Sequence, residues 1–219
     1  MSNLPRPTAI LYDWDNTLVD TWPVIHSAMN VLFRYMDMPE WTLLETKSNV
    51  RQSMRDAFPR MFGDRWEEAR DVFYQAFEAV HLNALVSLDG MRELLDGVKA
   101  AEIPQAVVSN KQGRYLRKEA EHLGIDGIFH SLIGAGDAAR DKPAPDPVHA
   151  ALEGTGIALG PHVLFVGDSG IDMQTAHAAG LTPILIGMPE GDEKALSDFP
   201  PAGRFDNLQA LHKFVTCHA

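Results

Sequence analysis

Ala9-Ile10-Leu11-Tyr12-Asp13-Trp14-Asp15-Asn16-Thr17 decides the fold of this 219-residue chain, because an apolar run ends there in two carboxylates. The four residues before Asp13 are typical of a short buried strand. Strand alternation places Asp15 on the same side as Asp13, with Trp14 between them at the expected edge of a site. A carboxylate at a strand's end can attack a phosphoryl group or hold a metal, although aspartate is also common in plain turns.

Three further polar clusters follow or interrupt strand-like runs. Ser109-Asn110 comes after Gln105-Ala106-Val107-Val108, and Lys142 precedes a proline-rich turn. Asp168-Ser169-Gly170-Ile171-Asp172 comes after Val163-Leu164-Phe165-Val166. Ligands of open α/β sheets bind outside the carboxyl ends of the strands, so we expect the four clusters to converge on one crevice.

The residue types in these clusters suit a phosphate and a hard cation. Asp168 and Asp172 bracket a strand-to-helix turn and suit Mg²⁺, which prefers oxygen ligands, although helix capping would also explain them. Ser109 and Asn110 could hydrogen-bond phosphate oxygens or cap the next helix. Lys142 could balance the charge of the acids and the phosphate, or be an ordinary exposed lysine.

The hydrophobic patterning divides the chain into two parts. From Trp22 to about Leu82 the apolar residues recur at helical spacing, and from Gly90 onward helical and strand-like segments alternate. The alternation predicts βαβ units and a parallel sheet. We therefore expect an α/β fold with a Rossmann-like parallel-sheet core, residues 1–20 and 84–219, carrying an inserted helical bundle, residues 21–83.

Composition limits the classes of partner. The net charge of -11 and the pI near 5.2 argue against nucleic acid as a partner. No apolar stretch is long enough for a membrane span, and the single cysteine, Cys217, cannot form an internal disulfide. These features favour a cytoplasmic protein. The apolar stripes of the insertion could serve a homodimer as readily as the core of a monomer.

The four motifs, in this order, resemble those of the haloacid dehalogenase superfamily of phosphatases, and the resemblance spans nearly the whole chain. The helical insertion is similar to the small helical cap of that family. The resemblance implies that Asp13 is the nucleophile, forming an aspartyl-phosphate, and that Asp15 first protonates the leaving oxygen and then activates water. An acid at position 15 favours phosphate esters over carbon-halogen or carbon-phosphorus bonds as the target.

The same resemblance implies a Mg²⁺ site and a phosphate site. The metal ligands would be the Asp13 carboxylate, the Asp15 backbone carbonyl and Asp168, with Asp172 assisting directly or through water. Thr17 would steady the first loop. Ser109, Asn110 and Lys142 would hold the transferring phosphoryl group.

The substrate expected from this resemblance is a small phosphorylated metabolite. The stretches Ser109-Asn110-Lys111 and Lys142-Pro143-x-Pro145-Asp146 look most like those of phosphoglycolate phosphatases, and a sugar phosphate is the other option. In the insertion, the resemblance to phosphoglycolate phosphatases would imply a glycine in the stretch Lys47-Ser48-Asn49-Val50-Arg51, and this stretch has none. Arg51 could bind a substrate carboxylate or second phosphate, or simply be a solvated helix charge.

Two other functions share this chemistry. A phosphomutase of the β-phosphoglucomutase type would use the same aspartyl-phosphate but return the phosphoryl group to a sugar. A phospho-accepting signalling module also combines an acceptor aspartate with acidic Mg²⁺ ligands, a hydroxyl residue and a lysine. Such a module needs neither Asp15 nor the helical insertion, which favours the enzyme.

Overall fold

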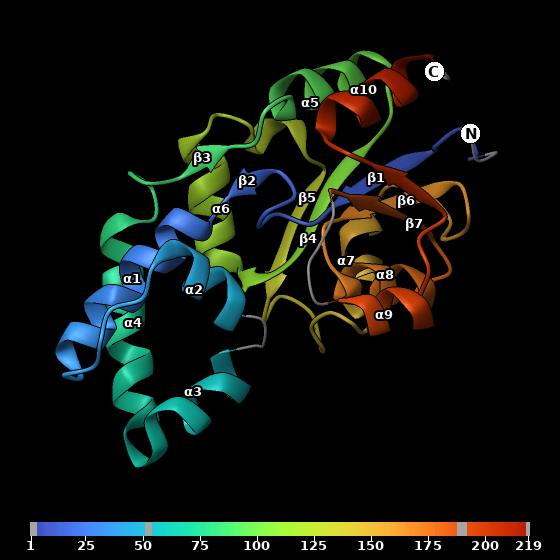
Figure 1. The fold of residues 1–219 in the computed structure, drawn as a ribbon. Coiled ribbons are helices and arrows are strands. Elements are labelled where there is room, and N and C mark those ends of the chain that lie inside the picture. The colour runs from blue at the N-terminus through green and yellow to red at the C-terminus, as the bar shows by residue number, and fades with distance from the viewer. Residues whose placement is uncertain (1–3, 51–53, 188–191, 218–219) are drawn as a thin grey trace. The chain divides into compact units, whose positions relative to one another are not determined.

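The chain forms two compact units in a computed structural model, which describes residues 4–50, 54–187 and 192–217. The larger unit comprises Met1–Val19 and Ser87–Ala219, and the smaller unit is Asp20–Val86. Two short strands, β2 (Val19–Asp20) and β3 (Val86–Ser87), pair where the chain passes from one unit to the other (Figure 1). The smaller unit is thus an insertion in the larger one.

The larger unit is built on a six-stranded sheet in the order β5-β4-β1-β6-β7-β8, with every described pairing parallel. This sheet confirms the predicted α/β class. The chain builds outward from β1 first on one side and then on the other, so β1 lies at the switch point of the strand order. The strands are β1 (Ala9–Tyr12), β4 (Gln105–Gln112), β5 (Ser131–Ala135), β6 (Val163–Gly167), β7 (Thr182–Ile186) and β8 (Gly203–Phe205).

Helices cover the sheet, which explains why every residue of β1, β6 and β7 is buried and why nearly all of them are apolar. Helices α7 and α8 pack on one face, where Val148 and Ala176 join Leu11 and Phe165 in one core cluster. Helices α5 and α10 lie side by side (Figure 1). The helices of this unit are α5 (Met91–Ala100), α6 (Gly113–His122), α7 (Asp146–Leu152), α8 (Gly170–Ala178), α9 (Glu193–Asp198) and α10 (Leu208–Cys217), with a 3₁₀ turn at Asp126–Ile128.

The smaller unit is a helical bundle, as the apolar spacing predicts. Phe33 and Trp41 meet edge to face with ring centroids 4.5 Å apart, inside a core that also contains Phe58, Phe62 and Phe73. Its helices are α1 (Trp22–Tyr35), α2 (Leu43–Asn49), α3 (Met54–Phe62) and α4 (Trp66–Val80), with a 3₁₀ turn at Gly63–Arg65. Among the described helices of the chain, none has both the length and the hydropathy needed to cross a membrane.

One boundary differs from the prediction in a way that affects the site. Strand β4 continues past its apolar run, through Ser109 and Asn110 to Gln112, and α6 begins at Gly113. The pairing of β4 with β5 changes register between Val108 and Gln112. Since irregularities of this kind re-aim side chains, the end of β4 carries more of the site than its apolar run suggests.

Candidate active site

The carboxyl ends of the three neighbouring strands β4, β1 and β6 carry the polar motifs. Asp13 follows β1, Ser109 lies in β4, and Asp168 follows β6. The Asp13 backbone N–H donates to the carbonyl of Val166 at 2.8 Å, which fixes the first loop against the end of β6. Parallel strands therefore place residues that lie about 150 positions apart in the sequence, such as Thr17 and Asp168, in direct contact.

Lys142 lies at the centre of the cluster. Its ammonium donates to Asp13 Oδ1 and to Asp172 Oδ1, both at 2.7 Å, and its side chain is only 2% exposed. Asn110 holds the lysine's backbone from the end of β4. Its amide nitrogen donates to the Lys142 carbonyl and its amide oxygen accepts from the Lys142 N–H, both at 3.0 Å. The structure thus uses the Asn110 side chain to fix the Lys142 loop.

Three carboxylates gather beside this ammonium. Ligand oxygens of Asp13, Asp168 and Asp172 all lie within 4.8 Å of one another, close enough to share one ion. Thr17 donates its hydroxyl to Asp168 Oδ1 at 3.1 Å. Asp172 also caps α8, because its Oδ2 accepts from the Ser169 hydroxyl at 2.6 Å and from the Ser169 N–H at 3.1 Å. Asp172 therefore has both of the roles considered from the sequence: it caps a helix, and it is part of the acidic cluster.

Burial raises the cost of ionising these acids. It is the main reason why the pKa of Asp13 is raised from its ordinary 3.8 to about 6, against the opposing effect of Lys142. Burial, together with the charges of Asp172 and Asp13, also raises the pKa of Asp168 well above its ordinary value. Burial alone would lower the pKa of Lys142, but the charges of Asp13 and Asp172 outweigh it and raise that pKa. The lysine therefore stays charged.

The charge balance and the donor atoms fit a divalent cation. Three clustered carboxylates, two of them paired with the Lys142 ammonium, leave an excess of about two negative charges when all are ionised. All the donors are carboxylate oxygens, the ligand type that Mg²⁺ prefers, and one or two carboxylates plus a substrate phosphate are its usual partners. The described residues therefore fit a Mg²⁺ ion.

Asp15 is held by a second buried lysine. Lys111 donates to Asp15 Oδ1 at 2.6 Å and to Glu119 Oε2 at 2.7 Å, and Trp14 Nε1 donates to the same Glu119 oxygen at 2.7 Å. The first loop turns through Asn16, whose φ of 61° is left-handed and is tolerated by asparagine. Trp14 is fully buried and hydrogen-bonded to Glu119, so it supports the loop that carries the two aspartates.

Sequence reasoning did not single out Lys111 and Glu119, although the sequence carries a signal for the latter. Tyr115, Leu116, Glu119 and Ala120 fall on one buried stripe of α6. A glutamate inside an otherwise apolar helical stripe indicates a buried acid, and a buried acid needs a cation or donor nearby.

Ser109 and Arg51 complete the residues predicted for the site. Ser109 is buried, and its hydroxyl oxygen accepts from the Lys111 N–H at 3.2 Å. Arg51 lies outside the described residues, so its role stays a prediction.

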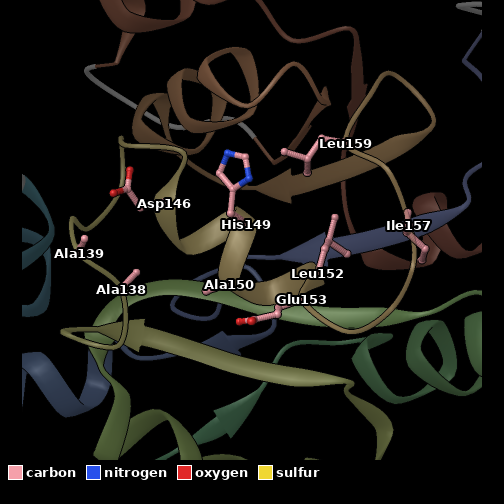
Figure 2. A pocket seen from close by; sticks show the side chains of 9 residues that line it. All are labelled: Ala138, Ala139, Asp146, His149, Ala150, Leu152, Glu153, Ile157 and Leu159. Atoms are coloured by element: carbon pink, nitrogen blue, oxygen red, sulfur yellow. The ribbon is translucent and has the colours of Figure 1, made fainter.

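A hollow of about 550 Å³ lies elsewhere in the larger unit. Asp146, His149 and Glu153 line it together with aliphatic residues of α7 and the following loop (Figure 2). Its lining, as far as the chain is described, does not include the clustered acids. The chemistry argued below therefore rests on the cluster at the ends of β1, β4 and β6.

The chain belongs to the haloacid dehalogenase-like hydrolase family, which it matches over residues 10–186. The family resemblance drawn from the motifs is thereby confirmed, and the chain is an enzyme of this hydrolase family. The phosphoglycolate phosphatase of Rhodobacter capsulatus is 29% identical over 217 residues, which cover 94% of this chain and 96% of that protein. The protein of the same name from Chromobacterium violaceum is 27% identical over 89% of this chain and 91% of its own length.

Solved structures agree with this assignment. A haloacid dehalogenase-superfamily hydrolase from Ehrlichia chaffeensis is 31% identical and superposes with a TM-score of 0.69, covering 99% of both chains. A haloacid dehalogenase-like protein from Streptococcus pneumoniae, 21% identical, reaches a TM-score of 0.83 over 95% of this chain and 98% of its own. The second likeness is one of fold, and it confirms the predicted architecture.

Proposed function

We propose that this chain is a Mg²⁺-dependent phosphatase that hydrolyses a small phosphorylated metabolite through an aspartyl-phosphate at Asp13. The observation that carries the proposal is the position of Asp13 at the end of β1, paired with Lys142 at 2.7 Å and grouped with Asp168 and Asp172. A carboxylate activated in this way can act as a nucleophile toward phosphorus.

Asp13, Asp168 and Asp172 offer the oxygens that would hold the ion, with Thr17 orienting Asp168. The Asp15 backbone carbonyl is proposed as a further ligand. Bound Mg²⁺ would screen the repulsion between the carboxylates and the phosphate and polarise a phosphoryl oxygen.

The proposed reaction has two steps. In the first, an Asp13 carboxylate oxygen bonds to phosphorus as the bond from phosphorus to the ester oxygen breaks, and Asp15 donates a proton to the departing oxygen. In the second, Asp15 takes a proton from water, which attacks phosphorus and releases phosphate from Asp13. Ser109 is proposed to donate to a phosphoryl oxygen, and Lys142 to balance negative charge, with Asn110 fixing the lysine's backbone.

The proposed substrate class is a small ester such as 2-phosphoglycolate or a sugar phosphate. Relatives named phosphoglycolate phosphatase support it, because they align over about nine-tenths of this chain or more. We further propose that Asp20–Val86 acts as a substrate-selecting cap, since it is a compact unit inserted directly after the nucleophile loop. Arg51 is the cap residue proposed to bind a second anionic group of the substrate.

Phosphate release from a panel of esters tests the proposal. The panel contains 2-phosphoglycolate, sugar phosphates and nucleotides, each assayed with Mg²⁺ and with a chelator, for the native chain and for Asp13→Asn. Asp89→Asn is the matched control, because Asp89 is an exposed aspartate of the same unit. We expect Mg²⁺-dependent release by the native chain and the control, and none by Asp13→Asn.

Two results would contradict the proposal. Release that is unaffected by the chelator would remove the metal from the reaction. Transfer of the phosphoryl group to a second sugar without free phosphate would identify the phosphomutase.

A further inference from the structure

The buried lysine beside Asp15 has no part in the reaction as described above. Lys111 is the last residue but one of β4, and its side chain is 6% exposed. Its two carboxylate partners come from different elements: Asp15 from the loop after β1, and Glu119 from α6. Lys111 therefore ties the loop that carries Asp15 to a helix of the surrounding core.

The far end of this network is fully buried and hydrogen-bonded. Glu119 is fully buried, and its Oε2 accepts from both Lys111 Nζ and the indole N–H of Trp14 at 2.7 Å. Trp14 is itself fully buried and precedes Asp15 in the chain. A side chain locked by packing and by hydrogen bonds can hold a neighbouring group in one geometry.

The end of the network at Asp15 is more exposed to solvent than the end at Glu119. The Asp15 side chain is 29% exposed, against 6% for Lys111 and none for Glu119. An aspartate at that exposure has more than one rotamer available unless a partner selects one. The 2.6 Å contact with Lys111 supplies that partner, and it engages one of the two carboxylate oxygens, Oδ1.

We propose that Lys111, anchored by Glu119 and Trp14, is a positioning residue that fixes the Asp15 carboxylate in the orientation needed for proton transfer. The inference rests on the proposed function of Asp15 and adds the residues that make it effective. Lys142 and Lys111 then have separate tasks: the first serves the nucleophile, and the second serves the acid.

The variant that tests this must keep the buried charges balanced. Lys111→Met alone would take away the ammonium that is paired with the buried Glu119 carboxylate, and breaking a buried ion pair by removing one partner is strongly destabilising. Lys111→Met combined with Glu119→Gln removes one positive and one negative charge together, and the glutamine oxygen can still accept from Trp14. Lys118→Met is the matched control, because Lys118 is exposed and lies next to Glu119 on the same helix.

The kinetic readout is kcat/KM for two esters, since this constant covers the steps through departure of the leaving group. An alkyl phosphate needs a proton on its leaving oxygen, whereas p-nitrophenyl phosphate needs little help. We expect the double variant to lose about 100-fold in kcat/KM for the alkyl phosphate and much less for p-nitrophenyl phosphate, because misplacing a catalytic group by about 1 Å has effects of this size. Lys118→Met should match the native chain on both. An equal loss on both esters, or no loss on either, would overturn the proposal.

Crystal structures of the native chain and the double variant give a readout that does not depend on turnover. We expect the Asp15 carboxylate in one conformer against Lys111 in the native chain, and displaced or in several conformers in the double variant. An unmoved Asp15 would refute the positioning role. If the native chain hydrolysed no ester, the proposed function would fail, and this comparison would still decide whether Lys111 positions Asp15.

Discussion

Replacing Asp13 by asparagine is expected to stabilise the metal-free protein at neutral pH. The pKa of Asp13 is raised from 3.8 to about 6, mainly by burial, so the folded state binds this proton more tightly than the unfolded state does. The stabilising effect of the proton is complete below about pH 4 and is lost as the pH rises through about 6. The pKa rise corresponds to about 3 kcal/mol of unfolding free energy at neutral pH.

Asparagine resembles the protonated carboxyl group and does not titrate. In urea unfolding with chelator present, Asp13→Asn should therefore exceed the native chain in unfolding free energy by up to about 3 kcal/mol at about pH 7.5, with the difference shrinking toward zero near pH 4. Asp89→Asn, at an exposed position, should show no such pH-dependent gain.

Added Mg²⁺ should make the native chain more stable than Asp13→Asn. It should stabilise the native chain more than Asp13→Asn, because a ligand raises stability only through its affinity for the folded state. The reasoning would be refuted if the metal-free variant were no more stable than the native chain at neutral pH, or if its advantage persisted unchanged in acid.

Three further substitutions test other parts of the site. Lys142→Met should lower the unfolding free energy at neutral pH by about 3–5 kcal/mol, because it strips two buried carboxylates of their cation; a urea titration showing no loss would contradict the buried pairing. Thr17→Val should cost about 1–3 kcal/mol and weaken Mg²⁺ binding in calorimetry, since Asp168 Oδ1 loses a donor; unchanged affinity would argue against Asp168 as a ligand. Asp15→Asn should reduce kcat/KM for alkyl phosphates more than for p-nitrophenyl phosphate, and equal losses would exclude its role as the acid.

The sheet and the strand-end motifs could be predicted because their physical cause is local. The central strands β1 and β6 are short apolar runs that end directly before a polar motif, as β1 ends at Tyr12 before Asp13. Parallel pairing then places the polar ends at one edge of the sheet without further information. The helical insertion was predictable for the same reason, since its apolar spacing is helical throughout.

The contacts within the site between residues far apart in the sequence could not be predicted from local patterns. The residue type of Asn110 suggests a phosphate ligand or a cap, and it does not reveal that each amide atom bonds the backbone of Lys142, 32 residues away. The extension of β4 through Lys111 depends on pairing with β5 and not on the polarity of its last residues. Short elements such as β8 (Gly203–Phe205) are stabilised mainly by their place at the edge of the sheet, and no local pattern marks them.

The assignment of Asp13 as nucleophile is tested most directly by trapping the intermediate. The native chain is mixed with its preferred ester and Mg²⁺, quenched in acid during turnover, and digested for peptide mass spectrometry. The account predicts a phosphoryl group on the Asp13 side chain in the native chain and none in Asp13→Asn, which should also be inactive. A phosphoryl group on another residue, or sustained turnover by Asp13→Asn, would contradict it.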